Sequence, residues 1–308
     1  MYTDFEDYGW SAGTHCQKVY QGYTTKIEKD VVISTWQSIY KMPKKYFEQF
    51  GCVVGDEAHM FKAKSLTSIM TKLHRCKYRF GFTGTLDGTE THRLVLEGLF
   101  GSVEQVVTTK ELIDKKTLAN LKIKCITLKH PEKREKMTYA EELDYIVSHE
   151  KRNTFLCDLL HHLNGNTLCL FQLVEKHGKV LYERMKGKEN VYFVYGATSA
   201  EQREEIRTIV DKSKNSTTIA SYGTFSTGIN IRNINNIVLA SPSKSKIRVL
   251  QSIGRGLRTS SSKNSILVFD IADDISYKGR YNFTLNHFFE RLNIYNEEQF
   301  NYEISKVK

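Results

Sequence analysis

Val53-Val54-Gly55-Asp56-Glu57-Ala58-His59 is a short apolar run that ends abruptly on a glycine and two carboxylates. An apolar run of this length is typical of a strand buried in a sheet, and the polar residues after it indicate where the strand emerges. Similar short apolar runs recur along the chain, separated by stretches with helical periodicity. Strands that alternate with helices predict a parallel sheet covered by helices, so we expect an α/β fold.

The first third of the chain is expected to contain strands at 30–34, 52–54 and 78–83. A helix is predicted over 64–73, because the apolar residues there recur at helical spacing. Residues 108–119 are polar and are expected to connect two domains.

The remainder of the chain repeats the alternation. Helices are predicted at 139–163, 176–185 and 199–210, the last with a capping box formed by Ser199 and Gln202. Strands are predicted at 121–126, 168–171, 191–194, 217–220, 236–239 and 265–269.

Composition favours a globular protein with a polyanionic partner. With 308 residues, two domains are expected, and 40% apolar and 26% charged residues exclude disordered and fibrous classes. The net charge of +10 favours nucleic acid, although a merely soluble basic protein remains an alternative. The six cysteines contain no C-x-x-C pair, which argues against a zinc site or a disulfide framework. No apolar run approaches a membrane span, so we expect a cytoplasmic protein with no membrane partner.

The two carboxylates after the first quoted strand are candidates for phosphoryl-transfer chemistry. Asp56 is expected to hold Mg²⁺ through water, and Glu57 to orient and deprotonate an attacking water. His59 is expected to relay the nucleotide state onward by a hydrogen bond. The alternative is an ordinary surface turn, because Asp-Glu pairs are common.

Two further segments follow predicted strands with glycines and hydroxyls. Thr83 and Thr85 flank Gly84 and are candidates for nucleic-acid contacts, although a helix cap or a turn would use the same residues. In the segment from Ser221 to Asn230, glycine backbone could approach a phosphate and hydroxyls could bind a nucleic-acid backbone; the alternative is a flexible loop. The candidates there are Thr224, Thr227, Gly228 and Asn230.

A basic region follows in the last third. Between residues 232 and 263 there are seven Lys or Arg residues and no Asp or Glu. Arg255 and Arg258 are three residues apart, so they share a helical face and could clamp a γ-phosphate as it leaves. Together with Gln251 and Gly254 they form the pattern Q-x-x-G-R-x-x-R, which is more specific than a solvated basic face.

Two isolated threonines are candidates for phosphate contacts. Thr198 lies at the predicted start of a helix, where backbone N–H groups can bind a phosphate or where the residue simply supports a cap. Thr35 follows the strand at 30–34 and has the same pair of interpretations.

Taken together, these segments resemble the motif series of superfamily 2 helicases, in the same order and spacing. Thr35 onwards resembles motif Ib, and 56–59, 83–85, 223–230 and 251–258 resemble motifs II, III, V and VI. The connecting stretches 32–38, 220–229 and 245–255 are similar to the UvsW-type recombination helicases of T-even bacteriophages.

The resemblance implies two RecA-like domains with parallel sheets, 1–115 and 116–308, the first incomplete at its N-terminal side. It implies ATP and Mg²⁺ as cofactors, nucleotide contacts at Gln251, Gly254, Gly228 and Asn230, and branched DNA or RNA–DNA hybrids as partners. It also implies a host-cell cytoplasmic location and unwinding or branch migration in recombination and repair.

One expected part is missing. No G-x-x-x-x-G-K-[ST] phosphate loop occurs in the 308 residues, although the family's first domain opens with one. Autonomous ATP turnover is therefore expected to be absent or slow, and an upstream segment carrying the loop is an expected partner. The alternatives are a non-catalytic nucleic-acid-binding module and the motor subunit of a restriction system.

Overall fold

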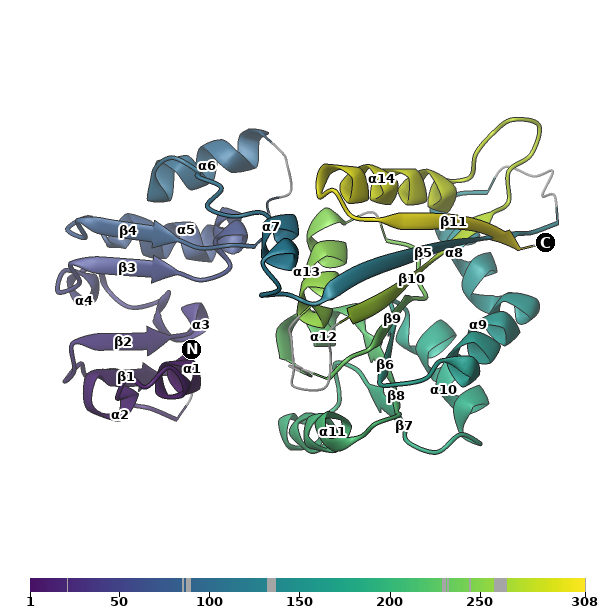
Figure 1. Ribbon diagram of the computed structural model, residues 1–308. Helices are drawn as coiled ribbons and strands as arrows, with labels where there is room; N and C mark the ends of the chain where they lie inside the picture. The colour runs from purple at the N-terminus through teal and green to yellow at the C-terminus, as the bar shows by residue number, and fades with distance from the viewer. Residues whose placement is uncertain are drawn as a thin grey trace. The chain divides into compact units, whose positions relative to one another are not determined.

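The computed structural model describes residues 1–20, 22–84, 86, 90–131, 137–228, 231, 233–243, 245–257 and 265–307. Contacts within the chain divide it into two compact units, Met1–Glu104 (unit 1) and Gln105–Lys308 (unit 2). Both units combine parallel strands with helices (Figure 1), which confirms the predicted α/β class. The expected domain boundary at 115–116 stays a prediction. Within the described residues, no helix combines the length and apolar character needed to cross a bilayer.

Unit 1 contains two pairs of parallel strands. β1 (Cys16–Val19) pairs with β2 (Val31–Ser34), and β3 (Cys52–Gly55) pairs with β4 (Tyr78–Gly81). The core beside β3 and β4 is formed by buried side chains that include Phe47, Met70 and Leu96. The helices of unit 1 are α1 (Tyr2–Asp7), α2 (Ala12–His15), α3 (Trp36–Ile39), α4 (Lys44–Phe47), the 3₁₀ helix η1 (Ala58–Lys62), α5 (Lys64–Lys72) and α6 (Glu90–Phe100).

Unit 2 is built on a seven-stranded parallel sheet with the strand order β11-β5-β10-β9-β6-β8-β7. Every residue of β6, β8 and β9 is buried, as expected for central strands of a parallel sheet. The strands are β5 (Asn120–Lys129), β6 (Thr167–Phe171), β7 (Val191–Val194), β8 (Thr217–Ser221), β9 (Asn236–Leu239), β10 (Ser265–Asp274) and β11 (Tyr302–Val307).

Helices cover both faces of this sheet. α11, α12, α13 and α14 contribute to one apolar core, and α9 and α10 contribute to the other. The helices of unit 2 are α7 (Thr109–Asp114), α8 (Tyr139–Ser148), α9 (Glu150–His162), the π-helix η2 (Val174–Gly178), α10 (Lys179–Met185), α11 (Ala200–Lys212), α12 (Tyr222–Gly228), α13 (Lys246–Gly256) and α14 (Phe283–Glu297).

Three predicted segments differ in the structure. The connection at 108–119 contains α7, because Thr108 and Glu111 form a capping box that starts a helix. The single helix at 139–163 is two helices, interrupted at His149, whose backbone is extended and whose ring accepts the Arg152 N–H. The segment beginning at Ser221 is mainly the helix α12. In contrast, the predicted capping box of Ser199 and Gln202 is confirmed.

Candidate functional site

The carboxyl end of β3 carries the residues predicted to handle a metal ion and a water. Asp56 and Glu57 follow Gly55 in a turn, and both side chains are exposed. Glu57 has a left-handed backbone (φ 50°), and its N–H donates to Asp56 Oδ1 at 2.9 Å. That conformation costs about 1 kcal/mol in a residue other than glycine, so surrounding contacts must hold it. The turn therefore fixes the backbone of both carboxylates at the sheet edge.

His59 joins this turn to the segment after β4. Its ring is buried, and Nδ1 lies 3.2 Å from Glu57 Oε2 and 2.9 Å from Thr83 Oγ1. Because a carboxylate can only accept, Nδ1 carries the proton in this contact. The backbone makes the same connection, since the Ala58 N–H donates to the Phe82 carbonyl at 2.8 Å. Residues from two separately predicted motifs are thus brought into direct contact.

Two glycines allow the strand ends to approach so closely. A Cβ at Gly55 would lie 2.9 Å from the Phe61 ring, and one at Gly81 would lie 3.0 Å from Ala58 and Phe100. Real side chains essentially never pack at such distances, so both positions exclude larger residues without local movement. Phe61 and Phe100 therefore pack directly on the backbone under the carboxylate turn.

The residues at this edge fit a magnesium ion of the nucleotide-bound kind. Mg²⁺ usually takes one or two protein carboxylates and completes its shell with water and substrate phosphates. Asp56 supplies an exposed carboxylate of that kind. Across the described parts of the chain, no group of three or more His, Cys, Asp or Glu side chains converges as a closed protein cage would.

In unit 2, the segment resembling motif V begins at the carboxyl end of β8. Thr224 is 4% exposed, and its hydroxyl lies 2.7 Å from that of Ser221, so in this conformation it faces the protein interior. Thr227 and Gly228 end helix α12, and the Thr227 side chain lies outside the described residues, as do Asn230 and, in unit 1, Thr85. Contacts of these residues with nucleic acid or nucleotide stay predictions.

The segment resembling motif VI forms α13. Its N-cap is Ser245, whose hydroxyl accepts the Arg248 N–H, and Arg248 lies over the Tyr222 ring of α12 at 5.4 Å. Gln251 is half-buried, whereas Gly254 is exposed. Arg255 lies in the helix with its side chain undescribed, and Arg258 lies outside the described residues. The two motif segments of unit 2 are thus neighbours, while the arginine clamp stays a prediction.

The two isolated threonines differ in accessibility. Thr35 is exposed at the N-cap of α3, and its hydroxyl lies 3.0 Å from that of Ser38. Thr198 is half-buried and accepts the Tyr195 N–H at 3.1 Å, while Ser199 caps α11. Thr35 is therefore the more accessible candidate for a phosphate contact.

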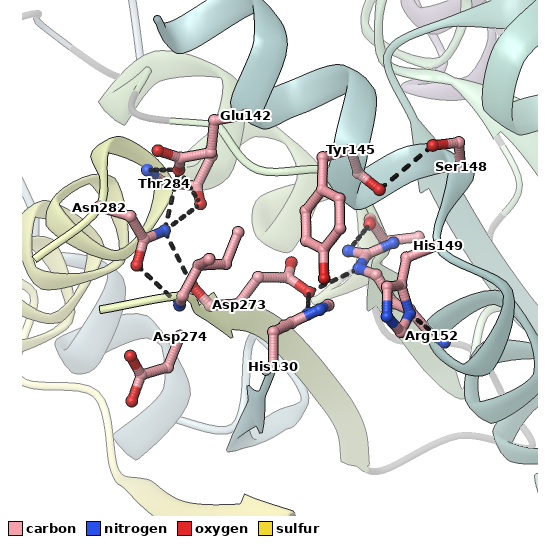
Figure 2. Close-up of polar contacts among 12 residues, drawn as sticks. His130, Glu142, Tyr145, Ser148, His149, Arg152, Asp273, Asp274, Asn282 and Thr284 are labelled. Atoms are coloured by element: carbon pink, nitrogen blue, oxygen red, sulfur yellow. Dashed lines mark hydrogen bonds and ion pairs between the residues drawn. The ribbon is translucent and has the colours of Figure 1, made fainter. Parts of the chain in front are cut away.

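A buried ion-pair network in unit 2 was not predicted (Figure 2). Arg152 of α9 donates to Asp273 Oδ1 at 2.7 Å and to the Ala240 carbonyl at 2.7 Å, and His130 Nε2 lies 2.8 Å from the same carboxylate. Burial disfavours ionisation of Asp273, but the Arg152 charge and both hydrogen bonds hold its pKa below the ordinary value. The network ties the carboxyl ends of β5, β9 and β10 to α9.

His177 extends the network toward the start of the motif segments. Its Nε2 lies 3.4 Å from Nη1 of Arg152, and its Nδ1 lies 2.9 Å from Ser241 Oγ. Tyr222, the first residue of α12, donates to the Ser241 carbonyl at 3.1 Å. Arg152 therefore supports, through buried contacts, the loop between β9 and α13.

Two more buried carboxylates hold α14. Asp270 of β10 accepts two hydrogen bonds from Arg291 Nε and one from its Nη2, at 2.7–3.0 Å, and a fourth from the Tyr295 hydroxyl at 2.8 Å. Glu142 accepts the Phe283 and Thr284 N–H groups at the start of the helix, as Figure 2 shows for Thr284. The available sequence signal was an acidic residue within an apolar strand, which indicates a buried partner without identifying it.

Comparison with known proteins agrees with this architecture. Residues 151–260 match the helicase conserved C-terminal domain, and residues 1–88 match the type III restriction enzyme res subunit. The chain is 34% identical, over its whole length, to the ATP-dependent DNA helicase UvsW of Enterobacteria phage T4, and it covers 65% of that protein. The crystal structure of T4 UvsW matches with a TM-score of 0.54 over 99% of this chain and 64% of that chain.

A solved fragment of a putative HsdR subunit of a type I restriction enzyme from Vibrio vulnificus has a TM-score of 0.68. It is 16% identical, and the match covers 95% of this chain and 54% of that chain, so it shows the fold alone. The parallel sheets and these matches define a RecA-like helicase fold, and the chain belongs to the superfamily 2 helicases. Within that class it is similar to the UvsW helicase of phage T4.

Proposed function

We propose that this chain is the motor portion of an ATP-dependent DNA helicase that translocates on, unwinds or branch-migrates branched DNA in recombination and repair. The observation that carries the proposal is the contact of His59 with both Glu57 and Thr83, in a chain 34% identical throughout to a phage DNA helicase. RNA–DNA hybrids are a second class of nucleic acid that such a motor would act on.

The carboxylate turn would carry the chemistry of hydrolysis. Asp56 would hold Mg²⁺ through water, and the ion would neutralise charge on the phosphates of the substrate ATP. Glu57 would orient the attacking water and accept its proton. Because His59 contacts Glu57 and Thr83 through one nitrogen, a change at Glu57 alters the hydrogen bonding of Thr83 directly. His59 would thereby transmit the state of the nucleotide.

Unit 2 would supply the remaining nucleotide contacts. Arg255 and Arg258 would stabilise charge on the γ-phosphate, because guanidinium groups bind phosphate oxygens in pairs. The other proposed nucleotide-binding residues of unit 2 are Gln251, Gly254, Gly228 and Asn230.

Nucleic acid would bind mainly through its phosphates. The seven basic residues between 232 and 263, with no acidic residue among them, supply the attraction. Hydroxyl contacts that position the strand without reading its sequence are proposed for Thr35, Thr83, Thr85, Thr198, Thr224 and Thr227.

DNA-stimulated ATP hydrolysis tests the proposal. The 308-residue chain is assayed alone and with a second polypeptide, the part of the phage T4 relative that precedes the matched region and is expected to carry the phosphate loop. We expect negligible turnover alone and DNA-stimulated turnover with the segment, reduced at least about 100-fold by Glu57→Gln. Robust Glu57-dependent turnover without the segment would contradict the proposed nucleotide site. DNA binding without turnover in either mixture would favour a non-catalytic binding module.

A restriction motor is a second candidate, favoured by the match of residues 1–88 to the res subunit of type III restriction enzymes. Such a motor drives cleavage by a nuclease partner or domain. The discriminating measurement is unwinding of a synthetic four-way junction by the reconstituted motor without any nuclease. Hydrolysis that never separates the junction, yet supports DNA cleavage by an added nuclease subunit, would favour the restriction motor.

A further inference from the structure

One face of the β3–β4 pair is covered by the protein itself. The register places Val53 opposite Arg79 and Gly55 opposite Gly81. These positions point toward the core of unit 1, where Val53 packs on the buried cluster and the rings of Phe61 and Phe100 cover the two glycines. This face has the cover that a parallel sheet requires.

The opposite face carries the alternate residues and is exposed. Cys52 pairs with Tyr78 and Val54 pairs with Phe80, and Phe82 continues the row after β4. Val54 is 53% exposed, Phe80 49% and Phe82 61%. We name these five residues the bare face. It contrasts with β6, β8 and β9 of unit 2, where both faces are buried, and contiguous exposed apolar surface on a sheet marks a binding site.

The outer edge of β4 also lacks a partner. Over the described residues, β3 and β4 pair only with each other. Parallel sheets of two strands are rarely stable alone, because each strand leaves one row of N–H and C=O groups unpaired. An added strand that pairs with β4 and a helix laid over the bare face would satisfy both deficits.

The carboxyl ends of the strands indicate what such a segment carries. Asp56, Glu57 and Thr83 follow β3 and β4 at one edge of the sheet. A strand added in parallel lies about 4.8 Å from β4, so the loop after it reaches the same edge. The component of the proposed site that the 308 residues lack is a phosphate loop, and such loops lie between a strand and a helix. The phage relative extends beyond the region matched by this chain, which covers 65% of it.

We propose that the bare face and the outer edge of β4 bind a strand–loop–helix segment that carries the phosphate loop, the strand pairing in parallel with β4 and the helix covering Val54 and Phe80. The proposal rests on the proposed function, since it assigns the docking place of that function's missing component.

Co-purification tests it without requiring catalysis. A tagged polypeptide, the part of the phage T4 relative that precedes the matched region, is co-expressed with the full 308-residue chain, and the chain retained on the tag is measured. Phe80→Asp and Val54→Asp place a charge at the centre of the proposed interface. Ile209→Asp is the matched control, because Ile209 is 41% exposed on α11, far from β4 in sequence. Far-UV circular dichroism of each variant alone verifies folding.

We expect the wild-type chain and Ile209→Asp to be retained equally, and Phe80→Asp and Val54→Asp to weaken binding by about 30-fold or more, as buried interface anchors do. Equal retention of all four would overturn the proposal. If the chain alone forms a dimer that Phe80→Asp dissociates, the face is an interface between copies and the proposal is wrong.

Glu57→Gln separates the two hypotheses. The docking proposal requires this variant to bind the segment like the wild type, whereas the proposed function requires it to lose hydrolysis. Docking that depends on Phe80 but yields no turnover in the wild type would refute the proposed function alone. Turnover that is unaffected by Phe80→Asp would refute the docking proposal alone.

Discussion

Acidification is expected to destabilise unit 2 through His177. The ring is fully buried, and its Nε2 faces the guanidinium of Arg152, which can only donate. A neutral ring with a proton on Nδ1 satisfies this arrangement, because Nδ1 can then donate to Ser241 Oγ. Burial, followed by the positive charge of Arg152, lowers the pKa of His177 to about 3. The folded protein therefore resists protonation of this ring.

The size of the effect follows from the difference in pKa. In the unfolded chain the histidine pKa returns to about 6.5, so from there down to about pH 3 the unfolded state binds more protons. The free energy of unfolding consequently falls as the pH falls, by about 1.4 kcal/mol per pH unit. Between about pH 6.5 and about pH 5 the loss attributable to His177 is about 2 kcal/mol. Burial, and then repulsion by His130, lowers the pKa of His149 also, which adds to the loss in the same direction.

Urea unfolding of the wild type and His177→Gln at pH 7 and pH 5 isolates the contribution. Glutamine keeps one donor and one acceptor but does not titrate, so the pH-dependent loss should be about 2 kcal/mol smaller in the variant. Far-UV circular dichroism follows unit 2. Trp10 and Trp36 both lie in unit 1, so tryptophan fluorescence supplies a transition whose pH dependence should be equal in the two proteins. If circular dichroism gave the same pH-dependent loss for both proteins, the reasoning would be refuted.

Three further changes test the packing of unit 2 by urea or thermal unfolding. Arg152→Leu leaves Asp273 buried without its ion pair and should lower the free energy of unfolding by about 3–5 kcal/mol; the added change Asp273→Asn should restore part of it, and no restoration would argue against an ionised Asp273. Gly256→Ala places a Cβ 2.1 Å from Ile266 Cδ1 and should cost about 1–3 kcal/mol, whereas Gly254→Ala meets no atom within 4 Å and should be neutral or stabilise by up to about 1 kcal/mol; equal losses would contradict this assignment of faces. Ser199→Ala removes the capping box of α11 and should cost about 1 kcal/mol, and an unchanged melting temperature would show that the cap contributes nothing.

The central strands of the fold could be predicted because burial on both faces requires short continuous apolar runs. β6, β8 and β9 satisfy that requirement at every residue. β11 escaped prediction because it is an edge strand with largely exposed side chains, so it lacks a buried pattern. The interruption at His149 escaped because the apolar periodicity continues across it, while a single extended residue turns the chain.

The polar side chains divide in the same way. Asp56, Glu57 and Thr83 could be placed at one sheet edge because parallel strands bring their carboxyl ends together. The contact of His59 with Glu57 and Thr83 depends on side-chain rotamers and could not be predicted. Arg152 could not be paired with Asp273, because spatial proximity here joins positions far apart in sequence.

The order of strands in unit 2 has a consequence for synthesis on the ribosome. β5 is the first strand of this sheet to be made, yet its partners β10 and β11 are the last. Until residues near 307 have left the exit tunnel, both long edges of β5 remain unpaired and open to association with other nascent chains. Contacts this distant in sequence also slow folding after release. Yield of native protein should therefore depend on chaperones that bind exposed strands during translation.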